Sequence, residues 1–215
     1  MIRDEDLASV KPHLRGWLHL GTFPLALVAG ALLTVLAPEG ERRAAVAVFG
    51  VSAALLFGVS ALYNRGRWGP RAAAVLKRLD HANIFLIIAG TYTPFAVVLL
   101  PAGPARTLLW IVWSGAVAGV AFRVLWVGAP RWLYVPVYVA LGWVAVAYLP
   151  QFADAGPAVL ALVVAGGLLY TAGGIVYGLR RPDPSPRWFG FHEVFHALTV
   201  VAFAAHCVGL ALAVA

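Results

Sequence analysis

The chain contains seven stretches of about 20 predominantly apolar residues, and this feature excludes most protein folds. As a helix, a run of that length crosses a hydrocarbon layer about 30 Å thick, whereas barrel strands would be about ten residues long and alternating. We therefore predict an all-α polytopic membrane protein, with residues 1–215 forming a single seven-transmembrane helix bundle. The predicted spans lie near residues 17–37, 44–63, 82–100, 107–127, 133–149, 157–179 and 191–215.

The composition supports this interpretation. Hydrophobic residues make up 62% of the chain and charged residues 12%, against about 45–50% and about 25% in a soluble domain. A soluble enzyme, a disordered protein and a nucleic-acid-binding module are therefore excluded. The single Cys207 rules out an internal disulfide. Because Asp4, Glu5 and Asp6 precede the first apolar run, we do not expect a secretory signal peptide.

The positive charges are distributed unevenly, and their distribution predicts the topology. The N-terminal tail, which includes Arg3, and the second, fourth and sixth connections with their adjoining span ends hold 13 of the 16 basic residues. Cytoplasmic segments of membrane proteins are enriched in Lys and Arg. We therefore predict a cytoplasmic N-terminus and an external C-terminus, and we interpret the net charge of +7 as a topology signal rather than a nucleic-acid partner.

Polar residues are scarce in the spans, so those near span ends carry most of the functional information. Given the predicted topology, three groups of them converge at the cytoplasmic end: Ser60 with Asn64, Asp80 with His81, and His192 with Glu193 and His196. Two histidines four residues apart on a helix share a face and can bind one metal ion. A zinc ion held by imidazoles would activate water and polarise a carbonyl group. The chemistry indicated is hydrolysis of an amide or ester at the membrane surface.

Several of these residues also have ordinary structural interpretations. Ser60 can bond back to its own helix, and Asp80 can form an interfacial ion pair with Arg78. His192 to His196 also reads H-E-x-x-H, which makes an intramembrane zinc protease a rival, with Glu193 as the general base. Alternatively, Glu193 caps the first turn of the last helix. We expect His13 and His19 to lie at the membrane interface and His206 to pack or hydrogen-bond within the bundle.

The motifs resemble the hemolysin III family, the bacterial branch of the progestin and adipoQ receptor (PAQR) superfamily. The resemblance rests on segments 11–19, 60–64, 79–85, 89–95 and 191–196, followed by His206. It implies a seven-helix bundle in the bacterial inner (plasma) membrane, with a zinc site near the cytoplasmic leaflet. It also implies that His192 and His196 are zinc ligands and that Ser60 and Asp80 bind water or act in catalysis.

The sequence departs from the family pattern at one position, because Asn64 stands where the resemblance implies a third histidine ligand. A carboxamide is a poor zinc ligand beside imidazole. Either zinc binds weakly through His192, His196 and Asp80, or the site has lost its metal, or Asn64 is an introduced substitution. His81 is not expected to replace the missing ligand, because adjacent helix positions point about 100° apart.

Two functions follow from the resemblance and the polar residues. The first is a zinc-dependent hydrolase of a lipid amide or ester, since the superfamily includes lipid amidases such as alkaline ceramidases. The second is a non-enzymatic membrane protein, either pore-forming (cytolytic) or regulating the state of membrane lipids, with a structural or vestigial metal site. In both, the partner is a membrane lipid and no nucleic acid is involved.

Overall fold

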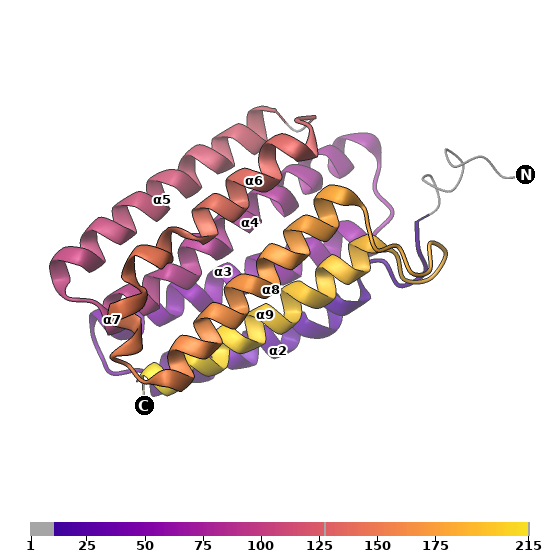
Figure 1. Cartoon of the computed structure of the whole chain (residues 1–215). Coiled ribbons are helices and arrows are strands. Elements are labelled where there is room, and N and C mark those ends of the chain that lie inside the picture. Colours follow the sequence, from indigo (N-terminus) through magenta and orange to yellow (C-terminus); the bar gives the residue numbers. More distant parts are fainter. Residues whose placement is uncertain (1–10, 127, 215) are drawn as a thin grey trace, which may run out of the picture.

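The computed structural model describes residues 11–126 and 128–214, and these residues form a bundle of long helices (Figure 1). Seven segments are long and apolar enough to cross a membrane, which confirms the predicted all-α, seven-span fold. The elements are α2 (Trp17–Leu36), α3 (Glu41–Arg65), α4 (Pro70–Leu99), α5 (Ala102–Leu125), α6 (Arg131–Gly142), the 3-10 helix η1 (Val144–Tyr148), α7 (Leu149–Ala153), α8 (Pro157–Leu179) and α9 (Phe191–Val214). Together, α6, η1 and α7 form the fifth span.

Helix α4 begins at Pro70, well before the predicted start of the third span at residue 82. Proline is favoured in the first turn of a helix, and the following residues 71–79 are nearly all good helix formers. Asp80 and His81 therefore lie inside a helix and are buried, rather than opening a span.

The fifth span is interrupted rather than continuous, because α6 ends at Gly142 and a 3-10 segment precedes α7. Backbone groups freed by such a break need partners inside a membrane. Tyr92 of α4 supplies them: its hydroxyl donates a hydrogen bond to the Gly142 carbonyl at 2.7 Å and accepts one from the Ala145 amide at 2.8 Å. The Trp143 indole also donates to Thr171 Oγ1 of α8 at 2.8 Å.

Small and polar residues face the interior of the bundle. The buried face of α2 consists of His19, Thr22, Ala26, Gly30 and Leu33, while its leucines and valines are mostly exposed. Without a hydrophobic driving force in lipid, helices associate through close backbone packing. A Cβ added to Gly30 would lie 2.9 Å from the Cα of Gly50 in α3, so the two backbones are in contact at this position.

The start of α2, the end of α3 and the start of α9 meet at one end of the bundle, together with the connections at 66–69 and 180–190 (Figure 1). We call it the polar end, and it is the predicted cytoplasmic end. Helix α9 finishes at the opposite end, as an odd number of spans requires. The orientation in the membrane stays a prediction from charge, and Arg3, Asp4, Glu5 and Asp6 lie outside the described residues.

Candidate functional site

Three histidines pack against one another at the polar end, of which His19 and His196 are buried and His192 is partly buried. The His19 ring of α2 lies parallel to the His196 ring of α9, with centroids 3.6 Å apart and an angle of 11°. The His192 ring meets His196 edge to face at 4.5 Å. We refer to His19, His192 and His196 as the histidine cluster. It joins the first span to the last.

The nitrogens of the histidine cluster are poorly satisfied. His19 Nδ1 and Nε2, His192 Nε2 and His196 Nδ1 are buried without a hydrogen-bond partner among the described residues. Leaving a buried polar nitrogen unbonded costs about 1–3 kcal/mol, and such groups occur where a protein binds an ion or performs chemistry. Unshared imidazole nitrogens are also the donors that zinc prefers, so the chemistry of this donor set fits a zinc ion.

Ser60 of α3 and Asp80 of α4 face the same cavity as the histidine cluster. Their side chains are close enough to interact, and both are almost fully buried. The predicted ion pair between Asp80 and Arg78 is not formed, because Arg78 donates instead to the carbonyls of Val124 and Ala74. Asp80 therefore faces the interior of the bundle.

Asn64 lies next to this site but not in its cavity. Its side-chain amide donates to the Ser60 carbonyl at 3.0 Å and to Ser60 Oγ at 3.3 Å. On its other side is Gly16, where a Cβ would lie 2.7 Å from the Asn64 Cβ and where φ is +79°. Glycine is the residue that most easily adopts this φ and leaves room for the Asn64 side chain. Asn64 thus positions Ser60, and Gly16 lets the start of α2 pack closely against Asn64.

His81 follows Asp80 but belongs to a different group of side chains. Its Nδ1 is in close hydrogen-bonding contact with the Arg123 guanidinium of α5, and its Nε2 lies 3.5 Å from the Tyr177 hydroxyl. The guanidinium carbon of Arg123 lies 4.2 Å from the centre of the Tyr134 ring. The Nδ1 of His81 is thus engaged by Arg123 rather than by the histidine cluster.

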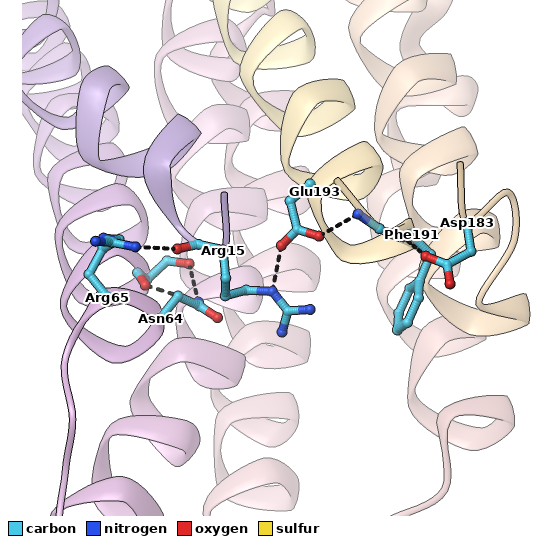
Figure 2. A network of polar contacts seen from close by, with 8 residues as sticks. Arg15, Asn64, Arg65, Asp183, Phe191 and Glu193 are labelled. Carbon is cyan, nitrogen blue, oxygen red and sulfur yellow. Dashed lines mark hydrogen bonds and ion pairs between the residues drawn. The ribbon is translucent and has the colours of Figure 1, made fainter. Parts of the chain in front are cut away.

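Figure 2 shows that Glu193 is occupied by structural contacts. One carboxylate oxygen forms an ion pair with Arg15 Nε, and the other accepts a hydrogen bond from the Gly190 amide at 2.9 Å. The second contact is a capping-box bond at the start of α9. Asp183 adds a further cap by accepting from the Phe191 amide at 2.8 Å. The arrangement matches the capping interpretation of Glu193 rather than a free general base.

An apolar cavity of about 160 Å³ extends from the site into the bundle. Along α4 its lining runs from Asp80 to Phe95, which is about 22 Å at 1.5 Å per residue. At the polar end the cavity adjoins a wider basin of about 810 Å³. Side chains of His81, Tyr177 and His192 line both spaces and form the wall between them.

Comparison with known proteins identifies the family. The sequence matches the Haemolysin-III related family over residues 7–207. The chain belongs to this family. It is 37% identical over 146 residues to the Hemolysin-3 homolog of Bacillus subtilis (strain 168), covering 67% of this chain and 68% of the relative. It is 35% identical over 142 residues to Hemolysin-3 of Bacillus cereus, covering 65% and 64% respectively.

The Haemolysin-III family belongs to the PAQR superfamily, which confirms the predicted resemblance. With seven membrane-spanning helices and bacterial relatives, the chain is a multi-pass bacterial membrane protein. Among residues 11–126 and 128–214, no three His, Cys, Asp or Glu side chains are grouped closely enough to form a ready-made metal site. Zinc therefore remains a prediction for this Haemolysin-III protein.

The sequence interpretation missed His19, which is 2% exposed and part of the histidine cluster rather than a residue of the membrane interface. A signal for this was present. His19 shares a helical stripe with Thr22, Ala26 and Gly30, and in membrane helices small and polar residues mark the packed face. His206 is placed as predicted, with Nε2 at 3.2 Å from the Val163 carbonyl.

Proposed function

We propose that this Haemolysin-III protein is a zinc-dependent membrane hydrolase that cleaves an amide or ester bond of a lipid. The observation that carries the proposal is the histidine cluster, whose buried nitrogens lack partners in the described chain, beside Ser60 and Asp80 in one apolar cavity. Ionisable groups placed this deep in a membrane protein are costly and are usually retained for function.

His192 and His196 would hold the zinc ion, with His19 in place of the histidine that the family pattern puts at position 64. The His19 and His196 rings lie parallel, so one of them must rotate about its Cβ–Cγ bond before both can direct a nitrogen at the same ion. When bound, zinc supplies a Lewis acid that activates water and polarises a carbonyl group. Asn64 contributes indirectly, by hydrogen-bonding to Ser60.

The remaining roles follow from the chemistry of the side chains. Asp80 offers a buried carboxylate, which can accept a proton from water and return it to the leaving group. Ser60 can donate a hydrogen bond to the carbonyl oxygen of the substrate, where negative charge develops. The apolar cavity would hold the hydrocarbon part of the lipid and exclude bulk water from these groups.

The first test measures metal content by elemental mass spectrometry on purified protein in detergent. We expect close to one zinc per chain in the wild type and a loss of at least about tenfold in zinc affinity for His192→Gln and His19→Gln, as is typical for a lost ligand or its support. His206→Gln is the matched control, since His206 is also buried in α9 but hydrogen-bonds to a backbone carbonyl.

The outcomes separate the roles of the residues. If His19→Gln still binds zinc and His192→Gln does not, His19 is not a ligand, and His192 and His196 of α9 remain as the proposed zinc ligands. Absence of zinc from both the wild type and Asn64→His would overturn the hydrolase proposal. Activity abolished by Glu193→Gln and only weakened by Asp80→Ala would favour the protease alternative.

Pore formation is a second candidate, because both relatives carry the name hemolysin. It predicts leakage of a dye from phosphatidylcholine vesicles that does not depend on the histidine cluster. Leakage that persists in a His192→Gln/His196→Gln double variant would favour this candidate. Leakage that requires the two histidines, or no leakage at all, would count against it.

A further inference from the structure

The basin at the polar end is strongly cationic. Among the described residues that line it, six are basic and none is acidic. They are Lys11, Arg15, Lys77, Arg123, Arg131 and Arg180, of which Arg15 is ion-paired with Glu193 from outside the lining. The pKa of the Lys11 ammonium is lowered, first by partial burial and then by the positive charges of nearby arginines, of which Arg15 has the largest effect. A concave surface with one sign of charge concentrates ligands of the opposite sign.

Two arginines in the basin wall pack against aromatic rings. Arg123, in the last turn of α5, is fully buried, and its guanidinium carbon lies 4.2 Å from the Tyr134 ring centre. Arg131 is stacked with its guanidinium carbon 4.6 Å from the Tyr177 ring centre and donates to the Tyr177 carbonyl at 3.3 Å. Both arginines are held in place by aromatic rings, as expected for a site that recognises a fixed anionic group.

The cationic basin and the apolar cavity are neighbours, because they share lining residues. Tyr177 lies against the basin cation Arg131 and also lines the cavity. His192 faces both spaces and belongs to the histidine cluster. A ligand with its head in the basin and its tail in the cavity would therefore pass the candidate catalytic groups at the junction of head and tail.

The lining of the cavity indicates the kind of tail. The lining is predominantly apolar and extends over roughly 22 Å of α4. The cavity therefore matches a linear hydrocarbon chain in length and in lining. Its length exceeds one leaflet, which is about half of the 30 Å hydrocarbon thickness. Ile84, Ile88, Val139 and Val164 are among its lining side chains.

We propose that the ligand is an acyl lipid with a phosphate-bearing headgroup: the phosphate sits in the cationic basin and one acyl chain occupies the cavity. If the protein is the hydrolase proposed above, this lipid class is its substrate. The binding of the lipid itself does not depend on the hydrolase proposal. The bond brought to the histidine cluster is then the acyl linkage next to the headgroup.

The test compares binding of 1-oleoyl lysophosphatidate and 1-oleoyl glycerol, which differ only in the phosphate, by native mass spectrometry in a neutral detergent. Oleate and inorganic phosphate are run in parallel. We expect the lysophosphatidate to bind most tightly, with little retention of inorganic phosphate. In a Lys77→Gln/Arg131→Gln variant its affinity should fall about fivefold for each cation removed. The matched control is Arg42→Gln/Arg106→Gln, which removes two exposed charges from the opposite end.

Equal binding of lysophosphatidate and oleoyl glycerol, or an equal loss in the two double variants, would overturn the proposal. Oleate that binds as tightly as the lysophosphatidate would overturn the phosphate assignment. All measurements are repeated on protein treated with a chelator and on His192→Gln/His196→Gln. If the zinc-free proteins still prefer lysophosphatidate to oleoyl glycerol, the lipid site is supported even if the hydrolase proposal fails. If the wild type binds zinc but does not prefer lysophosphatidate, the lipid site is refuted and the hydrolase proposal is not. Unchanged helical circular dichroism shows that each variant is folded.

Discussion

The two ends of the bundle are built from the same seven spans but bury different kinds of side chain. At the polar end the buried groups include His19, Asp80, Arg123, Glu193 and His196. Toward the opposite end the described buried residues are mostly apolar, among them Leu33, Leu100, Leu108, Phe152 and Leu210, with His206 as a buried polar exception.

The comparison separates what a membrane bundle needs from what this protein adds. Toward the opposite end the helices are joined mainly by close apolar packing, and the buried polar atoms without a partner in the described chain include Gln151 Oε1 and His206 Nδ1 there. The polar end has buried charges and the four unpartnered nitrogens of the histidine cluster, and in lipid such groups reduce stability unless each is partnered. We therefore read the polar end as the functional end, and the following predictions test that division.

The largest effect is expected from the two acidic side chains that pair with arginine at opposite ends. Glu193 is 1% exposed in its pair with Arg15, whereas Glu39 is 88% exposed in its pair with Arg43. Glu193→Gln places an amide donor against the arginine and should cost about 2–3 kcal/mol of unfolding free energy. Glu39→Gln should cost about 0–1 kcal/mol. Denaturant titration in mixed micelles measures both, and equal losses would remove the distinction between the ends.

A somewhat smaller effect is expected for packing toward the opposite end. A Cβ at Gly30 would meet the Gly50 backbone, whereas one at Gly21 of the same helix has nothing within 4 Å. Gly30→Ala should therefore destabilise the protein by about 1–3 kcal/mol, while Gly21→Ala should be neutral or stabilise by up to about 1 kcal/mol. Thermal unfolding gives the ranking. Zinc affinity should not change in either variant, and a change in Gly30→Ala would show that the two ends are coupled.

The smallest effect is expected to change sign with metal. His19 carries two unpartnered nitrogens, so His19→Leu should raise the stability of the chelator-treated protein by about 1 kcal/mol. With zinc present the wild type gains binding energy that the variant lacks, so the order should reverse. Thermal unfolding with chelator and with zinc provides the test. A variant that is less stable under both conditions would indicate that His19 has a packing role.

Much of the fold could be predicted from sequence because the lipid imposes a length rule on every span. The convergence of Ser60 and Asp80 with the α9 histidines followed from topology alone, and both side chains do face the cavity that the histidines line. The early start of α4 at Pro70 was missed because basic residues in a connection look like a loop, although they extend the helix beyond its apolar part.

The partners of individual polar groups could not be predicted. The pairing of Arg15 with Glu193 joins residues far apart in the chain, and the contact of His81 with Arg123 depends on the rotation of α4 against α5. Such contacts are set by tertiary packing, which hydropathy does not encode. His19 is an intermediate case: it was predicted at the membrane interface, although its position on the small-residue stripe of α2 was a signal of burial, and nothing in the sequence indicated the ring that it stacks on.

The histidine cluster joins the first span to the last, and this has a consequence for biosynthesis. His19 leaves the ribosome more than 170 residues ahead of His192 and His196. At about 5–20 residues per second, roughly ten to forty seconds of translation separate them. During that interval His19 can contact Phe57 of the second span but not the rings of α9. A chain truncated before the seventh span would insert most of its helices and still lack the cluster, so a metal ion held by all three histidines must be acquired after the seventh span has been synthesised.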